Sequence, residues 1–165
     1  MQGLKEIVLR LREHDVEFVL CGGFGVVAQG ASLVTRDVDV ACRMEPENLL
    51  RLFEAFAELR PVHRMTPQRL AFTREQAEKG GLKNLYLTTD WGQLDCLGEI
   101  RGVGDYAACL ARSEPIDLDG TVIRVLTLDA LIDAKRAMGR PRDLHAVLEL
   151  EAIRERLRGG EPEGR

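Results

Sequence analysis

The sequence predicts an α+β fold with a single core. At roughly 150 residues per domain, the length of 165 residues corresponds to one domain with at most a small terminal appendage. Hydrophobic residues follow a helical spacing in some segments and form β-branched or aromatic runs in others. Two turn signals, at Asp90-Trp91 and at Asp119-Gly120, each separate two extended apolar segments and predict hairpins.

The first half of the chain alternates between helical and extended patterns. The predicted elements are a helix over about residues 4–11, a strand over 16–21 that ends at Gly22-Gly23, a short helix over about 24–29 that ends at Gly30, a strand over 37–42, and an amphipathic helix that starts near Pro46. Residues 61–83 give no firm pattern beyond a loop with a short helix or strand.

The second half predicts two hairpins followed by two helices. The hairpins pair 84–89 with 92–97 and 115–118 with 121–125, the helices span Thr127 to about Met138 and about Arg142 to Arg158, and Gly139-Arg140-Pro141 separates them. We expect residues 1–126 to form the core of the domain, 127–158 to form a helix pair packed on it, and 159–165 to form a frayed tail.

The composition excludes several classes of protein. Hydrophobic residues make up 45% and charged residues 30%, which excludes a disordered, collagen-like or coiled-coil chain. The net charge of −4 excludes a protein that coats nucleic acid by bulk charge. The longest apolar stretch, residues 18–28, is about half the length of a membrane helix, and the N-terminus lacks the pattern of a secretion signal. We therefore expect a cytoplasmic protein without membrane contact, whose four separated cysteines are reduced core residues.

The predicted strand over 37–42 carries two unusual carboxylates. Asp is rare in strands, and the two-residue period of a strand places Asp37 and Asp39 on one face. Two charges about 4 Å apart repel by roughly 4 kcal/mol at an effective dielectric constant near 20. A divalent cation would relieve this repulsion, and carboxylate oxygens suit Mg²⁺. The alternative is a loop edge at which Arg36 or Arg43 pairs with the acids.

Asp95 is a third acid among apolar neighbours on a predicted strand. Together, three strand carboxylates could hold two metal ions and align a hydroxyl with a phosphoryl group, as in phosphoryl or nucleotidyl transfer. Backbone N–H groups at Gly22 and Gly23 could receive a triphosphate. The alternatives are a hairpin-edge acid that faces water for Asp95, and a tight strand-to-helix turn for the two glycines.

The order of these motifs resembles a known superfamily. Val19-Leu20-Cys21-Gly22-Gly23, then Thr35-Arg36-Asp37-Val38-Asp39-Val40, then Leu94-Asp95-Cys96 resemble the nucleotidyltransferases with the DNA polymerase β-type catalytic core. The segment from Gly22 to Val40 is similar to small bacterial nucleotidyltransferases, including the AbiEii-type toxins. Ala134-Lys135-Arg136 and Arg140-Pro141-Arg142-Asp143-Leu144 resemble the helix pair that follows the sheet in those proteins.

The resemblance implies a mixed β-sheet with flanking helices and a C-terminal helix pair. It also implies transfer of a nucleoside monophosphate from an NTP to an acceptor hydroxyl. By position, Asp37, Asp39 and Asp95 would hold Mg²⁺, with Mn²⁺ as the alternative ion, and Asp95 would also take the acceptor proton. The implied nucleotide-binding residues are Gly22, Gly23, Arg36 and Lys135. Phe24 departs from the small polar residue that often follows the glycines in the family.

Several alternatives remain open at the level of sequence. The acceptor could be an RNA end such as that of tRNA, a small molecule or a protein side chain, and a toxin-like protein would have a cognate antitoxin. The basic cluster of Lys135, Arg136, Arg140 and Arg142 is either a phosphate-binding surface or a solvated helix end. A chain that keeps the fold without catalysis would bind a nucleotide or a partner. Residues 23–28 also match a dinucleotide-binding pattern, but Gly30 ends the helix early and the two acids follow too soon.

Overall fold

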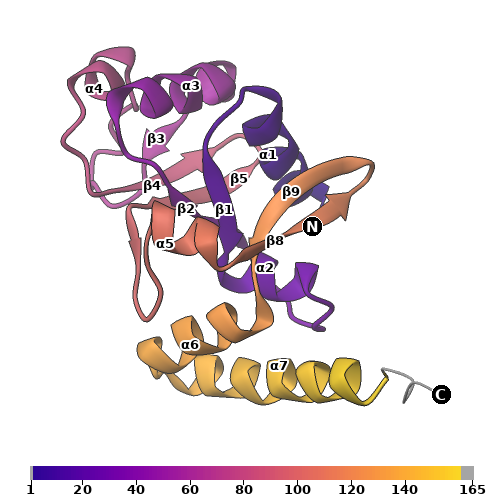
Figure 1. The fold of residues 1–165 in the computed structure, drawn as a ribbon. Coiled ribbons are helices and arrows are strands. Elements are labelled where there is room, and N and C mark those ends of the chain that lie inside the picture. The colour runs from indigo at the N-terminus through magenta and orange to yellow at the C-terminus, as the bar shows by residue number, and fades with distance from the viewer. Residues whose placement is uncertain (1, 161–165) are drawn as a thin grey trace.

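A mixed seven-stranded sheet forms the centre of the computed structural model, which describes residues 2–160 (Figure 1). The strand order is β3-β4-β5-β2-β1-β9-β8. In the middle of the sheet, β1 runs antiparallel to β2 and parallel to β9, while β2 runs parallel to β5. The predicted α+β fold with a mixed sheet is therefore confirmed.

The elements follow one another in this order. They are α1 (Gln2–Glu13), β1 (Phe18–Cys21), α2 (Gly22–Ala28), β2 (Asp37–Cys42), α3 (Pro46–Phe56), the 3₁₀ helix η1 (Ala57–Leu59), β3 (Val62–His63), α4 (Arg74–Lys79), β4 (Asn84–Thr89), β5 (Gly92–Leu97), β6 (Glu99–Ile100), β7 (Gly104–Asp105), α5 (Tyr106–Ala111), β8 (Ser113–Leu118), β9 (Thr121–Leu126), α6 (Leu128–Met138) and α7 (Pro141–Gly159).

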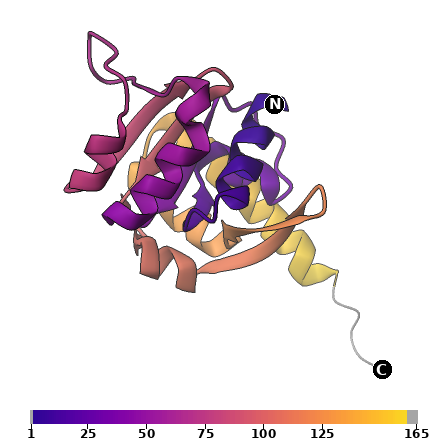
Figure 2. The same ribbon diagram turned by 90° about the horizontal axis from the view of Figure 1, so that it is seen from above.

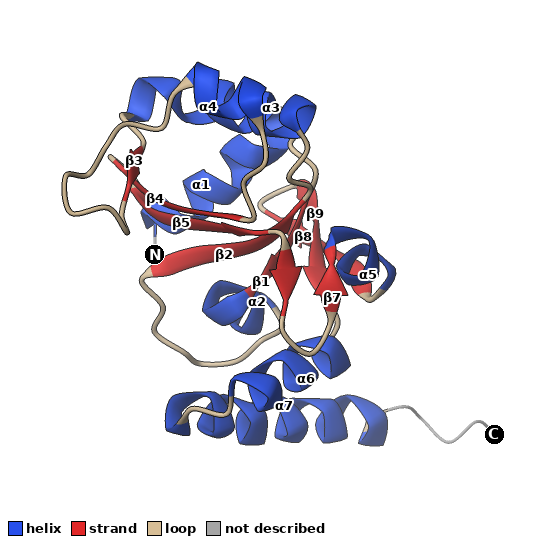
Figure 3. Cartoon of the chain, turned by 90° about the vertical axis from the view of Figure 1, so that its left-hand side faces the viewer, coloured by secondary structure: helices blue, strands red, loops and turns tan. Residues whose placement is uncertain are grey.

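The two faces of the sheet pack against different helices. Helices α1, α3 and α4 lie on one side, and α2, α6 and α7 lie on the other (Figure 3). Val38 and Val40 of β2 belong to the core with α1 and α3, whereas Ala41 belongs to the core with α6 and α7. Because side chains alternate along a strand, Asp37 and Asp39 point to the same side of the sheet as Ala41, toward α6.

Most local predictions match the structure closely. Strand β2 and the β4–β5 hairpin have the predicted bounds, and Thr127 caps α6 by accepting a hydrogen bond from the Ala130 N–H at 3.3 Å. All four cysteines are buried and free, as expected. Helix α2 begins at Gly22 rather than at Phe24, so the glycines form its first turn instead of a separate loop.

The segments without a clear sequence pattern contain short elements that depend on neighbours. Strand β3 has two residues and pairs with β4, and α4 begins with a capping box at Thr73. Part of the segment between β3 and α4 forms a loop that projects from the rest of the chain (Figure 2), whereas Phe72, near its end, is buried in the core. The sequence does not predict the β6–β7 pair or α5. Two-residue strands and a helix of six residues are too short to show a periodicity of hydrophobic residues.

Two sequence predictions concern the ends of the chain and the membrane. Helix α7 continues through Gly159, one residue beyond its predicted end, and residues 161–165 of the predicted tail lie outside the described residues. Within residues 2–160, no helix combines the length and the apolar character that crossing a bilayer requires.

Candidate functional site

Three carboxylates meet where β2 and β5 run side by side. The parallel register of the two strands places Asp39 directly opposite Asp95. Asp37 lies two residues before Asp39 on β2, so its side chain is on the same face of the sheet. One carboxylate oxygen from each of Asp37, Asp39 and Asp95 lies within 4.8 Å of the other two. The predicted triad is thus brought together in space, and we refer to it below as the carboxylate triad.

The electrostatics of the carboxylate triad are unfavourable without a cation. Burial, followed by the charges of Asp37 and Asp95, raises the pKa of Asp39 from 3.8 to about 7. The charges of Lys135 and Arg64 lower it, but they do not compensate the other effects. No ion pair of residues 2–160 involves Asp37 or Asp39, so the alternative in which arginines pair with them is not supported.

Asp95 does not face water, contrary to the alternative that its hairpin position left open. The residue is only 7% exposed. Its Oδ2 accepts a hydrogen bond from Arg64 Nη2 at 2.7 Å, and its Oδ1 is buried with no hydrogen-bond partner. Burial raises the pKa of Asp95, while the hydrogen bond and charge of Arg64 lower it, and the net shift is upward. A buried carboxylate oxygen without a partner is costly, which is consistent with the predicted role of Asp95, and that role stays a prediction.

Gly22 and Gly23 are required for close approach to the acids. Gly22 has a φ of 61°, and a Cβ there would lie 2.0 Å from Asp39 Oδ2. A Cβ at Gly23 would lie 2.7 Å from the hydroxyl of Thr35, which donates hydrogen bonds to Asp37. The glycines therefore leave room beside the carboxylates. Their role as phosphate ligands stays a prediction.

The two predicted basic residues lie in different surroundings. Lys135 of α6 is close enough to Asp39 to lower its pKa, but its Nζ lies 3.4 Å from Asp143 Oδ1. Asp143, at the start of α7, is 2% exposed and also accepts a hydrogen bond from Arg140 Nε at 2.5 Å. Arg36 is exposed and directly precedes Asp37, and no ion pair within the described part of the chain includes it.

Arg64 is the residue of this site that sequence reasoning missed. It follows β3 in the segment that gave no firm pattern, and its contact with Asp95 joins positions 31 residues apart. No local signal marks it, because an arginine in a loop is usually a solvated side chain. Only the pairing of β3 with β4 brings it to the carboxylate triad.

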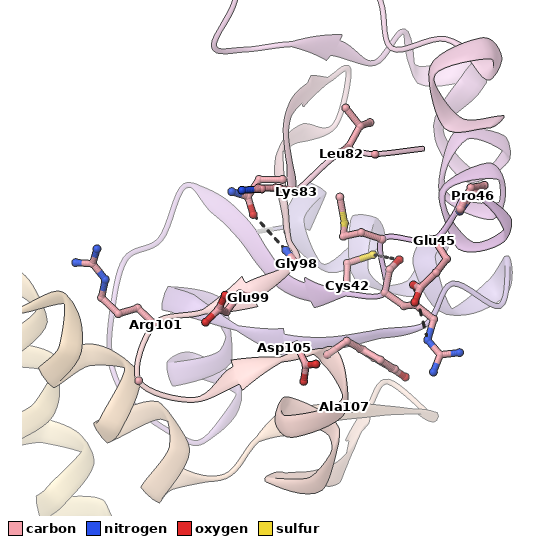
Figure 4. A pocket seen from close by; sticks show the side chains of 16 residues that line it. Cys42, Glu45, Pro46, Leu82, Lys83, Gly98, Glu99, Arg101, Asp105 and Ala107 are labelled. Atoms are coloured by element: carbon pink, nitrogen blue, oxygen red, sulfur yellow. Dashed lines mark hydrogen bonds and ion pairs between the residues drawn. The ribbon is translucent and has the colours of Figure 1, made fainter. Parts of the chain in front are cut away.

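A hollow of about 1050 Å³ lies at the opposite end of β2 and β5 (Figure 4). Its lining includes Cys42, where β2 ends, Gly98, which follows β5, and Tyr106 of α5. Both acidic and basic side chains border it, and none of the three triad carboxylates does. The hollow is therefore a separate feature from the carboxylate triad.

The donor set of the triad fits a divalent metal ion. Hard carboxylate oxygens are the ligands that Mg²⁺ and Mn²⁺ prefer. Asp95 keeps one oxygen, Oδ1, without a hydrogen-bond partner, and the absence of a side chain at Gly22 leaves space beside Asp39 Oδ2. Burial and then repulsion by Asp37 and Asp95 raise the pKa of Asp39, and the charge of a bound cation would act against both effects.

Comparisons of the whole chain with known proteins agree with this geometry. The sequence profile of the aminoglycoside-2''-adenylyltransferase family matches residues 3–150. A comparison with curated proteins finds no match.

Solved structures with the same fold include two antibiotic-related proteins. The lincosamide antibiotic adenylyltransferase LnuA, solved with lincomycin bound, has a TM-score of 0.60 at 14% identity over 92% of this chain and 96% of that chain. The antibiotic-resistance factor ANT(2'')-Ia has a TM-score of 0.57 at 13% identity, over 96% and 90%. TM1012 from Thermotoga maritima has a TM-score of 0.51 at 19% identity, over 96% and 92%. At these identities the structures show a shared fold.

The profile match extends from α1 into α7 and includes every residue of the carboxylate triad. The family and the fold together confirm the resemblance to the nucleotidyltransferase superfamily. The chain is a nucleotidyltransferase that belongs to the aminoglycoside-2''-adenylyltransferase family.

Proposed function

We propose that the chain transfers AMP from ATP to a hydroxyl group of a small molecule of the aminoglycoside class. The observation that carries this proposal is the family profile over residues 3–150, whose span contains a triad of carboxylates within 4.8 Å of one another. LnuA, which shares the fold, is an adenylyltransferase of another antibiotic class, so a small-molecule acceptor is consistent with this architecture.

The reaction forms one bond and breaks one. The acceptor oxygen bonds to the α-phosphorus of ATP, the bond from that phosphorus to the bridging oxygen breaks, and pyrophosphate leaves. Asp37, Asp39 and Asp95 would hold Mg²⁺, with Mn²⁺ as a substitute, and a bound ion supplies positive charge for the phosphoryl oxygens and the leaving group. Asp95 would take the acceptor proton.

The nucleotide would lie beside the glycines and the basic residues. Gly22 and Gly23 leave room next to Asp39, so the phosphates can approach the backbone there. Lys135 would neutralise part of the triphosphate charge, because its ammonium is near enough to Asp39 to lower the pKa of that residue while it pairs with Asp143. Arg36, exposed beside Asp37, would make an outer contact with the nucleotide.

A small molecule is favoured over RNA as the acceptor. Three residues of the basic cluster already pair with acids: Lys135 and Arg140 with Asp143, and Arg136 with Glu151. A surface that binds RNA needs uncompensated charge for the phosphates, and the two acids neutralise half of the four positive charges here. The cognate antitoxin and the cytoplasmic location remain predictions.

The test is a transfer assay with labelled nucleotides. The purified chain is incubated with Mg²⁺, one α-labelled NTP at a time, and a panel of aminoglycosides, a lincosamide and bulk tRNA. We expect label from ATP on an aminoglycoside and release of pyrophosphate, with both abolished by EDTA. Label on tRNA alone would overturn the acceptor class. A rise in melting temperature with Mg²⁺ and ATP but no consumption of any NTP would identify a catalytically inactive, nucleotide-binding module.

A further inference from the structure

We infer that Arg64 is a positioning residue, which holds the Asp95 carboxylate in the orientation that metal binding and proton transfer require. The inference deepens the proposed function and depends on it for the role of Asp95. Arg64 lies between β3 and α4, outside the three motifs that resemble the superfamily. It is not one of the residues proposed above to contact the metal ion or the nucleotide. Its function would be exerted through Asp95.

The guanidinium of Arg64 connects two residues of β5. Its Nη2 donates to Asp95 Oδ2 at 2.7 Å, and its Nη1 donates to Gln93 Oε1 at 2.9 Å. Gln93 and Asp95 are two positions apart on one strand, so their side chains lie on the same face. A planar guanidinium with two separate acceptors has one defined orientation, which a lysine ammonium would not have.

Strand β4, which lies between β3 and β5, also contacts Arg64. The Arg64 guanidinium carbon lies 5.8 Å from the centre of the Tyr86 ring, and Tyr86 is paired with Asp95 across the β4–β5 hairpin. The backbone N–H of Arg64 donates to the Tyr86 carbonyl at 2.8 Å. The backbone, the ring and the Gln93 side chain therefore restrict Arg64, whose side chain is 21% exposed.

The two carboxylate oxygens of Asp95 differ in their hydrogen bonding. Oδ2 is occupied by Arg64, whereas Oδ1 has no partner and is buried. Rotation of the carboxylate out of its present plane would break the hydrogen bond with Arg64, so the contact opposes that rotation. Arg64 thus fixes the direction in which the carboxylate oxygens of Asp95 point relative to Asp37 and Asp39.

The experiment that separates positioning from simple charge balance measures Mn²⁺ affinity by electron paramagnetic resonance. Removing a positive charge beside a cation site should tighten Mn²⁺ binding if Arg64 only balances charge. If Arg64 orients Asp95, Arg64→Gln should instead weaken Mn²⁺ binding by about 10-fold, the usual scale for a residue that supports a ligand. Unchanged or tighter binding would overturn the inference, and this result does not depend on catalysis.

The matched control is Arg74→Gln. Arg74 also combines an ion pair, with Glu54 at 3.4 Å, and a contact with an aromatic ring, that of Phe53 at 5.3 Å. It belongs to α4, on the side of the sheet opposite to α6 (Figure 3). The control should bind Mn²⁺ and turn over like the unchanged chain.

Turnover provides the second readout. We expect Arg64→Gln to lower kcat by about 10- to 100-fold, with the KM for ATP within about threefold because Arg64 contacts no predicted nucleotide ligand. Guanidinium ion added at low millimolar concentration should restore part of the activity of Arg64→Ala, which a misfolded chain would not show. An unchanged kcat would overturn the inference. If the unchanged chain transfers nothing to any acceptor, the proposed function fails, and the Mn²⁺ titration still decides the role of Arg64.

Discussion

Two buried acidic sites in this molecule differ in how their charge is balanced. Asp143 at the start of α7 is 2% exposed and has two cationic partners, Lys135 and Arg140. Burial raises its pKa, but the hydrogen bond from Arg140 and the charge of Lys135 outweigh burial, so the pKa is lowered. In the carboxylate triad, Lys135 and Arg64 also lie near Asp39, yet its pKa is raised to about 7.

The difference separates a structural acid from the acids that we propose to bind a ligand. Asp143 joins α6 to α7 and needs no further partner, since each of its oxygens is engaged. The carboxylate triad contains three acids, one cationic hydrogen-bond donor and one orphaned oxygen. This uncompensated charge supports the proposal that a cation binds at the carboxylate triad.

The largest expected effect is on catalysis by the β2 acids. Asp37→Asn or Asp39→Asn should lower nucleotide transfer by at least about 100-fold, because each removes charge from the proposed metal site. Steady-state transfer at saturating Mg²⁺ measures this. Asp15→Asn, an exposed acid near Arg12, is the matched control and should retain full activity. Activity near that of the control in both triad variants would exclude these residues from the site.

Asp95→Asn should separate binding from chemistry. We expect the affinity for ATP to stay within a few-fold, while kcat falls by about 100-fold, the common scale for loss of a general base. Isothermal titration with a non-hydrolysable ATP analogue and single-turnover kinetics give the two quantities. If turnover were unchanged, the proton acceptor would have to be another residue, and Asp90 in the adjacent turn would be tested next.

Asp143→Ala should destabilise the fold strongly. The substitution leaves Lys135, whose side chain is 16% exposed, without its acid, and we expect a loss of about 3 kcal/mol, at the lower end for a broken buried pair because Arg140 is 44% exposed. Urea unfolding measures the change. Since the pKa of Asp143 is lowered on folding, its contribution is present at neutral pH and is lost as the pH falls below about 4. A loss below 1 kcal/mol would contradict the structural role.

The carboxylate triad should give the opposite dependence on pH. The pKa of Asp39 is higher in the folded state than in the unfolded state, so the folded protein binds more protons between about pH 4 and pH 7. Without metal, stability should therefore fall by about 1 to 3 kcal/mol as the pH rises through this window. Asp39→Asn should remove the decrease and make the metal-free chain more stable at pH 8. Urea unfolding in EDTA at pH 5 and pH 8 tests both points. If Asp39→Asn were less stable than the unchanged chain at pH 8, the charge of Asp39 would have to be compensated within the protein, contrary to this prediction.

The smallest expected effect concerns the exposed end of the basic cluster. Arg142 is exposed, and no ion pair of residues 2–160 includes it. Arg142→Ala should change stability by less than about 0.5 kcal/mol and leave transfer to a small molecule within twofold. Salt titration of tRNA labelling provides the contrast, because a phosphate contact by Arg142 would lower the salt slope by somewhat under one unit. That outcome would return RNA to consideration as the acceptor.

Local sequence was sufficient for the parts of this fold that short-range rules govern. The alternation of Val38 and Val40 with two acids determined the bounds of β2 and the common face of Asp37 and Asp39, because a strand has a period of two. The β4–β5 hairpin, the Thr127 cap of α6 and the break at Gly139 follow from turn and capping chemistry within a few residues.

Only the tertiary structure decided how these parts form a site. The parallel register of β2 with β5, which sets Asp39 opposite Asp95, depends on contacts that no local pattern encodes. The same holds for Arg64, whose loop reaches Asp95 through pairing of β3 with β4, and for Asp143, which closes the α6–α7 junction. The physical reason is that hydrophobic periodicity specifies only which face of an element is buried. Long-range packing and strand register specify which charged groups come together, and they therefore determine the raised pKa of Asp39 and the unpartnered oxygen of Asp95.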